Sequence, residues 1–345
     1  MIAIIADDFS GAAELAGIAE ARGFKAEVQT QFDPNSDAEV IAVDTDTRLR
    51  TESEAVQIVG EVTRQIIAAT PVWIYKKTDS VLRGHIRAEI EAILDATGKR
   101  DCLYIPANPS KGRIIDGGLY FVNGVPLNET VFAHDPDYPC HTAVVRELIG
   151  ESERIRVPDV TSMDDLKHLI DASTLTAGAA DFFASSIAFL GCGLRDVTSH
   201  SAQARKPMLL LCGSLAAWDS GRADEMKKRR FVVQTLDQPI SPAIWQQTQK
   251  IMLAIGHPQS ADTAILTARL IETALPLIAA QNGLRIGLEG GATAMAFIRR
   301  MGWTRFEVIP EGHTGVGTLR PPGGPILCVK PGSYPWPEGC LECQD

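Results

Sequence analysis

Short apolar segments alternate with amphipathic helical segments along most of this chain, and this alternation constrains the fold more than any other feature. The segment Ile2–Ala6 is apolar at every position, as is typical of a strand buried on both faces of a parallel sheet. The polar run 7–11 follows it and opens a helical segment that reaches Arg22. Strand and helix repeated at this spacing predict an α/β fold with mainly parallel sheets flanked by helices.

The same pattern predicts the other elements before residue 190. Thr51 and Glu54 have the spacing of a capping box, which marks a helix start. Residues 107–140 are rich in Gly, Pro and Asn, and the Asn123-Gly124 pair is typical of a tight hairpin, so we expect a loop or lid that faces the ligand. We expect strands at 25–29, 40–43, 72–75, 102–106 and 154–157, and helices from residue 51, at 86–96, from a cap at Ser162, and at 178–190.

With 345 residues the chain is longer than one core usually supports, so two domains are expected. Residues 191–206 lack periodicity and precede Pro207, which places the boundary between an acid-ligand domain, 1–205, and a second domain, 206–345. The active site is expected in the cleft between them. In the second domain we expect strands at 208–212, 284–288, 306–309 and 326–329, and helices at 217–229, 242–255 and 262–281.

The composition excludes several classes of protein. The formal net charge is −10, which disfavours nucleic acid or an anionic membrane as a partner, because both need a basic surface. The chain starts without a basic leader and contains no apolar run long enough to span a bilayer, so a cytoplasmic protein is expected. Cys340 and Cys343 form an isolated pair without further metal-ligating neighbours, which argues against a zinc site.

Polar side chains follow two of the predicted strands of the first domain. Asp7 and Asp8 come after the first strand, and the run 76–84, with two lysines, an aspartate, two hydroxyls and an arginine, follows another. In open α/β sheets ligands bind at the carboxyl ends of strands, so this edge is expected to bind a small polyol or acidic ligand. Arg83 suits bidentate capture of a carboxylate.

Each of these residues also has a purely structural interpretation. Asp7 or Asp8 could cap the following helix, and Arg83 could form a salt bridge at a helix start. Lys76 and Lys77 point to opposite faces if the strand continues, so at most one of them faces the ligand, and we favour Lys77.

Glycine turns follow predicted strands of the second domain. Gly213-Ser214 and the run 290–293 both join a strand to a helix, where exposed N–H groups can bind phosphate. The loop 330–333 adds a further glycine after a strand. Neither the P-loop motif nor the dinucleotide-binding motif is present, so any nucleotide site is of another type.

The segment Asp44–Arg48 raises a different hypothesis. Asp44 and Asp46 follow a strand as in the Asp-x-Asp motif of phosphatases. That motif has Thr or Val two residues after the second aspartate, where this chain has Arg48, so the phosphatase pattern is incomplete.

Together these motifs resemble the four-carbon acid sugar kinase family, enzymes that phosphorylate tetronates and 3-oxo-tetronates with ATP, and the chain looks like a shortened and divergent member. The motifs run in the family's order across nearly the whole chain. The matching segments are Ile5–Ala12, Asp44–Arg48, Lys76–Gly84, Val122–Leu127, Gly213-Ser214 and Gly290–Thr293.

The resemblance implies that the N-terminal domain holds the sugar acid, that the C-terminal domain holds ATP, and that Mg²⁺ accompanies the ATP, its ligands in the chain unknown. Arg83 or Arg48 would hold the substrate carboxylate, Lys77 would offset phosphate charge, and Asp8 would orient or deprotonate the hydroxyl, with Asp79 as the rival base. The implied substrate side comprises Asp7, Asp8, Ser10, Arg48, Lys77, Asp79 and Arg83, to which we add Ser80 from the same run; the implied nucleotide side comprises Ser214, Gly290, Gly291, Ala292, Thr293 and Gly332.

Two alternatives remain beside the kinase. Ala292 stands where the glycine turn of the family usually has an acidic residue, so the chain could be a non-catalytic sensor of acid sugars and nucleotides. The phosphatase hypothesis is the weaker alternative. The sequence leaves open whether the chain forms a homodimer, which sugar acid it takes and which hydroxyl is phosphorylated.

Overall fold

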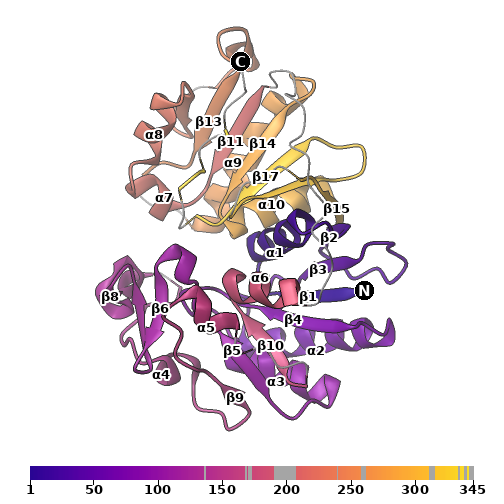
Figure 1. The fold of residues 1–345 in the computed structure, drawn as a ribbon. Helices are drawn as coiled ribbons and strands as arrows, with labels where there is room; N and C mark the ends of the chain where they lie inside the picture. The colour runs from indigo at the N-terminus through magenta and orange to yellow at the C-terminus, as the bar shows by residue number, and fades with distance from the viewer. Residues whose placement is uncertain are drawn as a thin grey trace. The chain divides into compact units, whose positions relative to one another are not determined.

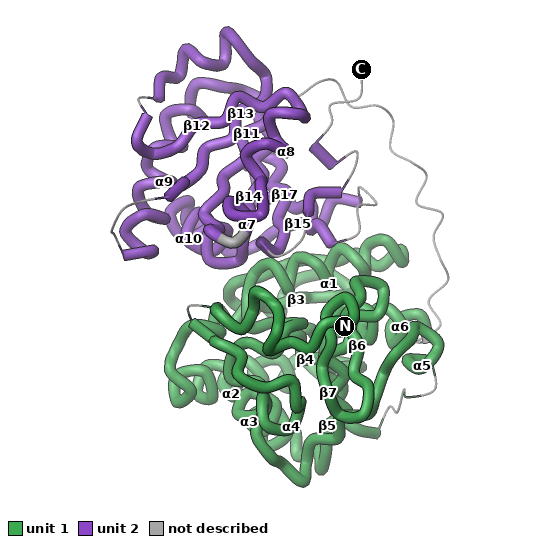
Figure 2. The backbone as a smooth tube through the Cα atoms, turned by 90° about the vertical axis from the view of Figure 1, so that its left-hand side faces the viewer, with its two compact units in different colours: residues 1–195 green, residues 196–345 purple. Residues whose placement is uncertain are grey.

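The chain divides into two compact units, and each is described by itself. The computed structural model describes residues 1–135, 137–167, 169, 173–189, 207–238, 240–257, 262–310, 315–332, 335–337 and 340–341 (Figure 1). Unit 1 comprises residues 1–195 and unit 2 comprises residues 196–345 (Figure 2). The boundary predicted at residues 205 and 206 lies outside the described residues.

Unit 1 contains a parallel sheet with helices on both faces. Its strands lie in the order β2-β3-β1-β4-β10-β5-β9. Helices α1 and α6 pack together on one face, and α2 and α3 pack together on the other (Figure 1). The elements are β1 (Ile2–Ala6), α1 (Phe9–Ala21), β2 (Ala26–Gln29), β3 (Val40–Asp44), α2 (Glu52–Ala68), β4 (Trp73–Lys77), α3 (Ile86–Thr97), β5 (Cys102–Ile105), α4 (Val145–Ile149), β9 (Ile155–Arg156), α5 (Met163–Lys167), β10 (Leu175–Gly178) and α6 (Ala180–Phe189).

The chain leaves the neighbouring strands β1 and β4 in opposite directions. From β1 it runs through α1 toward β2, and from β4 it runs through α3 toward β5, on the other side of the sheet. In open α/β sheets such a reversal of strand order opens a crevice at the carboxyl ends of the strands. Ala6 pairs with both Asp44 and Lys77 in register, so the residues that follow these three positions lie at one edge.

A small antiparallel sheet follows β5. It contains β6 (Arg113–Asp116), β7 (Leu119–Val122) and β8 (Val125–Pro126), and short 3-10 helices at Leu127–Glu129 and Val131–His134 come after it. Asn123 and Gly124 join β7 to β8 with positive φ angles of 52° and 80°, which confirms the predicted hairpin.

Unit 2 contains a second, mainly parallel sheet. Its strand order is β12-β13-β11-β14-β17-β16-β15, and only β16 runs against its neighbours. Helices α7 and α8 lie on one face and α9 and α10 on the other (Figure 2). The elements are β11 (Met208–Cys212), α7 (Leu215–Asp219), α8 (Arg222–Lys228), β12 (Val232–Thr235), a 3-10 helix (Pro242–Gln246), β13 (Lys250–Ala254), α9 (Thr263–Ala279), β14 (Arg285–Glu289), α10 (Gly291–Met301), β15 (Arg305–Val308), β16 (Gly317–Arg320) and β17 (Ile326–Lys330).

The two units share the arrangement of their first strands. When the strands of each unit are counted along the chain, the first four lie side by side in the order second, third, first, fourth. This order is β2-β3-β1-β4 in unit 1 and β12-β13-β11-β14 in unit 2. The reversal of direction in unit 2 therefore falls between β11 and β14, as it falls between β1 and β4 in unit 1. Gly213-Ser214 and the run 290–293 follow these two strands of unit 2.

Several predicted elements were wrong. The helix predicted at 242–255 is a 3-10 helix followed by β13, a buried strand paired to β11. The helix predicted at 217–229 is broken between α7 and α8 at Gly221, which has a φ of 86°. The helix predicted from residue 178 begins at Ala180, because Gly178 ends β10, a central strand that the sequence pattern did not reveal. Strands β12 and β16 were also missed.

Among the described residues, no helix combines the length and the apolar character needed to cross a membrane.

Candidate functional site

Arg48 joins the two adjacent aspartates that follow β1. Its Nε donates to Asp7 Oδ2 at 2.8 Å and its Nη2 to Asp7 Oδ1 at 3.0 Å, while its Nη1 donates to Asp8 Oδ2 at 3.0 Å. The backbone N–H groups of Thr47 and Arg48 also donate to the Asp7 carbonyl. One guanidinium thus holds the turn after β1 against the turn after β3.

Asp8 has the capping role that the sequence allowed for it, and it also belongs to the polar cluster. It is the N-cap of α1, and its Oδ1 accepts from the Gly11 N–H at 2.9 Å. Its Oδ2 also accepts from the Ser10 hydroxyl at 2.6 Å. A cap of this kind contributes about 1 kcal/mol to stability, so removing the side chain would damage the helix as well as the polar cluster.

Asp79 and Arg83 form a second charged pair at the same edge. The Nε and Nη2 groups of Arg83 each donate to one oxygen of Asp79 at 2.9 Å, a bidentate contact. Asp79 Oδ2 also accepts from the backbone N–H of Val81 at 3.1 Å. The Nη1 of Arg83 donates to Asp135 at 3.2 Å, a residue from the segment after the antiparallel sheet. A quarter of the Arg83 side chain is exposed.

The two lysines of β4 point to opposite faces. Lys76 is fully buried against Glu89 of α3, an ion pair without solvent contact. Lys77 faces α1: its ammonium donates to the Thr78 carbonyl at 2.9 Å and lies 3.7 Å from Glu14. A Cβ atom on Gly11 would come within 3.2 Å of the Lys77 Nζ. Lys77 therefore lies beside the start of α1 and the Asp8 cap.

The segment after β5 supplies residues that sequence reasoning did not name. Arg113 donates to the Ser80 hydroxyl, and the Tyr120 hydroxyl donates to the Ser80 carbonyl. The Tyr138 hydroxyl donates to the Arg48 carbonyl. Only the expectation that residues 107–140 face the ligand pointed to this segment, because nothing in its residue pattern identified the partners.

The electrostatics of the cluster keep these aspartates ionised. Burial opposes the charge on Asp79, but Arg83 and Arg48 outweigh it and hold the pKa of Asp79 well below its usual range. Burial likewise opposes the charge on Asp8, while Arg48 and Lys77 lower the pKa of that carboxyl. The carboxylates in turn raise the pKa of Arg48 against the effect of burial.

Asp44, at the end of β3, differs from these aspartates because its pKa is raised and not lowered. It is buried, its Oδ1 accepts from the Asp46 N–H at 2.9 Å, and its Oδ2 has no hydrogen-bond partner among the described residues. Burial raises the pKa of Asp44 well above its usual range, and the charges of Asp46, Asp8 and Asp7 add to this shift. Burial thus disfavours the ionised form of this carboxyl, which is the form that a phosphatase nucleophile needs, and this argues against the phosphatase hypothesis.

The glycine turns of unit 2 come together at the edge between β11 and β14. A Cβ atom on Gly332 would lie 2.6 Å from the Ser214 Oγ, and one on Gly213 would lie 2.2 Å from the Thr293 Oγ1. Gly290 has a φ of 98°, and its own Cβ would lie 3.8 Å from both side chains. Helix α10 starts here, so the N–H groups of its first turn, which includes Gly291, Ala292 and Thr293, face the same edge.

A buried ionic cluster lies at the strand ends beneath these turns. Glu289 is fully buried, and its Oε1 accepts from Arg222 and from Lys330, each at 2.9 Å. The Lys330 ammonium also donates to the Pro331 carbonyl at 2.7 Å. Sequence reasoning did not find this cluster, because Arg222 is 67 residues from Glu289 and no local pattern connects them.

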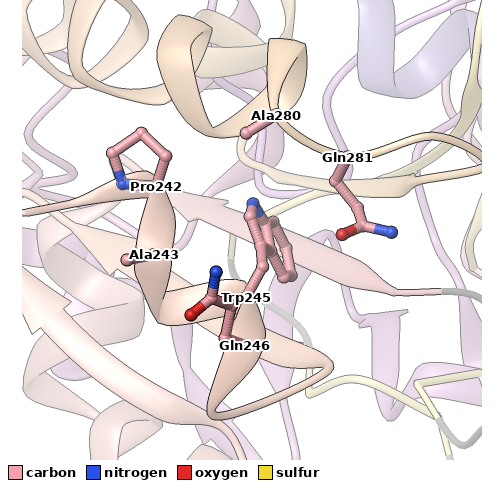
Figure 3. A pocket seen from close by; sticks show the side chains of 6 residues that line it. All are labelled: Pro242, Ala243, Trp245, Gln246, Ala280 and Gln281. Atoms are coloured by element: carbon pink, nitrogen blue, oxygen red, sulfur yellow. The ribbon is translucent and has the colours of Figure 1, made fainter.

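A surface hollow in unit 2 lies elsewhere. It is lined by the 3-10 helix before β13 and by the end of α9, which precedes β14 (Figure 3). Both segments lie at the amino ends of parallel strands, opposite the glycine turns. The Trp245 indole in this hollow already donates to the Leu277 carbonyl at 2.9 Å. This hollow therefore lies at the opposite end of the strands from the glycine turns.

The described residues include no group of three or more His, Cys, Asp or Glu side chains arranged to hold a metal ion.

The chain was compared with protein families and with known proteins. Residues 2–182, more than half of the chain, match a family described as a sugar-binding N-terminal domain. A D-erythronate kinase of Heliobacterium modesticaldum is 33% identical over 159 residues, which cover 44% of this chain and 36% of that protein. A 3-oxo-tetronate kinase of Methylobacterium radiotolerans is 25% identical over 415 residues, which cover 96% of this chain and 95% of that protein.

The fold is also found in a solved structure. A Haemophilus influenzae protein is similar over 97% of both chains, with a TM-score of 0.71 and 20% identity, which shows a shared fold. The chain matches well under half of the length of the D-erythronate kinase. The 3-oxo-tetronate kinase is matched along nearly its whole length, but its sequence identity is lower.

The raised pKa of Asp44 predicts how stability depends on pH. Because the folded state raises its pKa, the stabilising effect of the proton is fully present below the unfolded value of about 3.9 and is lost as the pH rises through the folded pKa. Asp44→Asn imitates the protonated acid. We expect its melting temperature to equal that of the wild type at acid pH, to exceed it increasingly between the unfolded and the folded pKa, and to exceed it by a constant amount above the folded pKa, at about 2–4 °C per kcal/mol.

Asp116→Asn, at an exposed aspartate of the same unit, is the control for the loss of one charge. Melting curves between about pH 5 and pH 9 test the prediction. A difference between Asp44→Asn and wild type that does not change over this range would contradict it.

Proposed function

The chain belongs to the four-carbon acid sugar kinase family, and we propose that it transfers a phosphoryl group from ATP to a hydroxyl of a small sugar acid, such as a tetronate or a 3-oxo-tetronate. The observation that carries the proposal is the pair of strand-end sites. In unit 1 paired aspartates, arginines and Lys77 gather at the reversal of strand order. In unit 2 a cradle of glycine turns lies at the equivalent position.

Arg83 is the group that binds the substrate carboxylate. Most of the N–H groups of Arg48 already donate to Asp7 and Asp8, so this guanidinium positions the aspartates. Arg83 uses its Nε and Nη2 edge for Asp79, and the edge formed by Nη1 and Nη2, where Asp135 makes one hydrogen bond in this structure, is the edge for a ligand. A bidentate contact there fixes the substrate in one orientation.

Asp8 is the group that orients the attacking hydroxyl. Asp79 is a poor base, because its oxygens accept from Arg83 and from backbone N–H groups and because its pKa is held well below the usual range. The pKa of Asp8 is lowered less. Phosphoryl transfer depends more on alignment and charge than on early proton removal, so an ionised carboxylate that accepts from the hydroxyl suits this role.

Lys77 supplies positive charge beside Asp8. Its ammonium is buried next to the first turn of α1 and shares only a long contact, 3.7 Å, with Glu14. It can therefore balance negative charge that develops as the phosphoryl group is transferred. The Ser10 hydroxyl donates to Asp8 and can accept a hydrogen bond from a polyol, and the Ser80 hydroxyl accepts from Arg113.

The glycine cradle of unit 2 is the proposed nucleotide site. Gly213, Gly290 and Gly332 leave room where a side chain would meet Ser214 or Thr293, so phosphate oxygens can approach the backbone. The N–H groups that open α10 then serve as donors. Mg²⁺ would be held mainly through the phosphates, as is usual for this ion, and it would neutralise part of their charge.

An ADP-release assay tests the activity. The protein is incubated with ATP, Mg²⁺ and each of D-erythronate, D-threonate and 3-oxo-tetronates, and we expect ADP to form only when an acid is present. Binding of an acid without turnover would favour the sensor, for which Ala292 was the sequence argument. Release of phosphate from a sugar phosphate without ATP would favour the phosphatase.

Asp8→Asn tests the role of the carboxylate at the start of α1. Asparagine keeps the oxygen that caps the helix but loses the negative charge, so we expect kcat to fall by about 100-fold or more with little change in melting temperature. Asp262→Asn is the matched control, because Asp262 caps α9 in the same way and is outside both strand-end sites. A variant of Asp8 that keeps normal turnover would contradict the assignment.

Gly332→Ala tests the nucleotide site. The added methyl would collide with Ser214 at 2.6 Å and fill the cradle, so we expect ATP affinity to fall by about tenfold or more while binding of the acid is unchanged. Gly60→Ala is the control, because its methyl would meet only the end of the Arg64 side chain at 3.5 Å. Isothermal titration with ATP and with the acid separates the two effects, and equal loss of both would point to general unfolding.

A further inference from the structure

The acid-sugar site contains more negative than positive charge in this structure. This matters because the proposed substrate is itself an anion, and an anion is not bound tightly where carboxylates already outnumber the cations. Some carboxylate must therefore move away when the substrate arrives. The carboxylates are Asp7, Asp8, Glu14, Asp79 and Asp135, and the cations are Arg48, Lys77, Arg83 and Arg113.

Most of these carboxylates are held in place by the sheet and its helices. Asp7 and Asp8 follow β1 directly and share the Arg48 guanidinium, and Asp8 also caps α1. Asp79 follows β4 and accepts from two backbone N–H groups besides Arg83. Glu14 lies within α1. Moving the side chain of Asp7, Asp8 or Asp79 would break hydrogen bonds at the end of a regular element.

Asp135 is different in position and in bonding. It follows the 3-10 helix Val131–His134 in an irregular segment, and it meets Arg83 through a single hydrogen bond of 3.2 Å. That bond occupies the edge of Arg83 that Asp79 leaves open. A substrate carboxylate could make two such charge-assisted bonds to this edge, where Asp135 makes one.

We propose that Asp135 occupies the place of the substrate carboxylate on Arg83 and is displaced by it when the sugar acid binds. This inference rests on the proposed function of unit 1. It makes Asp135 a specificity residue: a neutral polyol of the same size cannot compete for Arg83, whereas an acid can. Asp135 also keeps Arg83 in its binding orientation while the site is empty.

The other oxygen of Asp135 has a separate role. Its Oδ1 accepts from the backbone N–H groups of Asp137 at 3.1 Å and Tyr138 at 2.9 Å. Tyr138 in turn donates to the Arg48 carbonyl. Displacement of the Asp135 carboxylate from Arg83 is therefore coupled, through Tyr138, to the turn that contains Arg48.

The variant Asp135→Asn separates the two roles. Its amide oxygen can still accept from the Asp137 and Tyr138 N–H groups, while its NH₂ group cannot accept from Arg83. Asp137→Asn is the matched control: it removes the same charge two residues away, from an exposed side chain without a contact to Arg83 among the described residues.

The test measures binding by isothermal titration in the absence of ATP, with D-erythronate and D-threonate as acids and erythritol as the neutral polyol. We expect Asp135→Asn to bind the acid about tenfold more tightly than wild type, equivalent to about 1.4 kcal/mol. Erythritol binding and the melting temperature should not change, and Asp137→Asn should match wild type.

The possible outcomes distinguish this inference from the function on which it rests. If wild type binds an acid and Asp135→Asn binds it equally or more weakly, Asp135 does not compete for Arg83 and the inference is wrong. If Asp137→Asn tightened acid binding equally, the effect would come from the loss of a nearby negative charge in general, and the inference would also be wrong. If no variant binds either acid, the proposed function fails together with the inference.

Discussion

The contact of Arg48 with Asp7 and Asp8 is the interaction on which the proposed acid-sugar site depends. Two adjacent carboxylates repel each other, and one buried guanidinium lies against both of them and offsets this repulsion. The same guanidinium connects the turns after β1 and β3. Removing it would leave two uncompensated buried charges, a much larger cost than the loss of one surface pair. The site and the local fold are therefore stabilised by one group.

The repeated strand order of the two units explains why two kinds of ligand site occur in one chain. In both units the first and fourth strands diverge, and a crevice opens at their carboxyl ends. In unit 1 charged side chains fill this position. In unit 2 glycine turns and a helix N-terminus fill it, above the buried Glu289 cluster. One topology thus provides the position, while the residues after each strand decide the chemistry, a sugar acid in one unit and phosphate in the other under the proposed function.

Structural and functional roles are combined in the same residues here. Asp8 caps α1, which confirms the structural interpretation, and it also takes part in the charged cluster to which its proposed function belongs. Lys76 and Lys77 differ from Asp8, because these two adjacent residues have different surroundings and different roles. One is buried in an ion pair with Glu89, and the other faces the start of α1, because successive side chains of a strand point to opposite faces.

The sequence by itself determined the fold class, the capping box at Thr51, the hairpin at Asn123-Gly124 and most residues at the two strand-end edges, because these follow from local periodicity and turn chemistry. Only the tertiary structure decided that 250–254 is a strand, that Gly178 ends a central strand, and that Asp135 meets Arg83, 52 residues away. A short apolar run becomes helix or strand according to its neighbours in space. The pairing of charged side chains likewise depends on how the fold brings the turns together, and a local sequence pattern does not predict it.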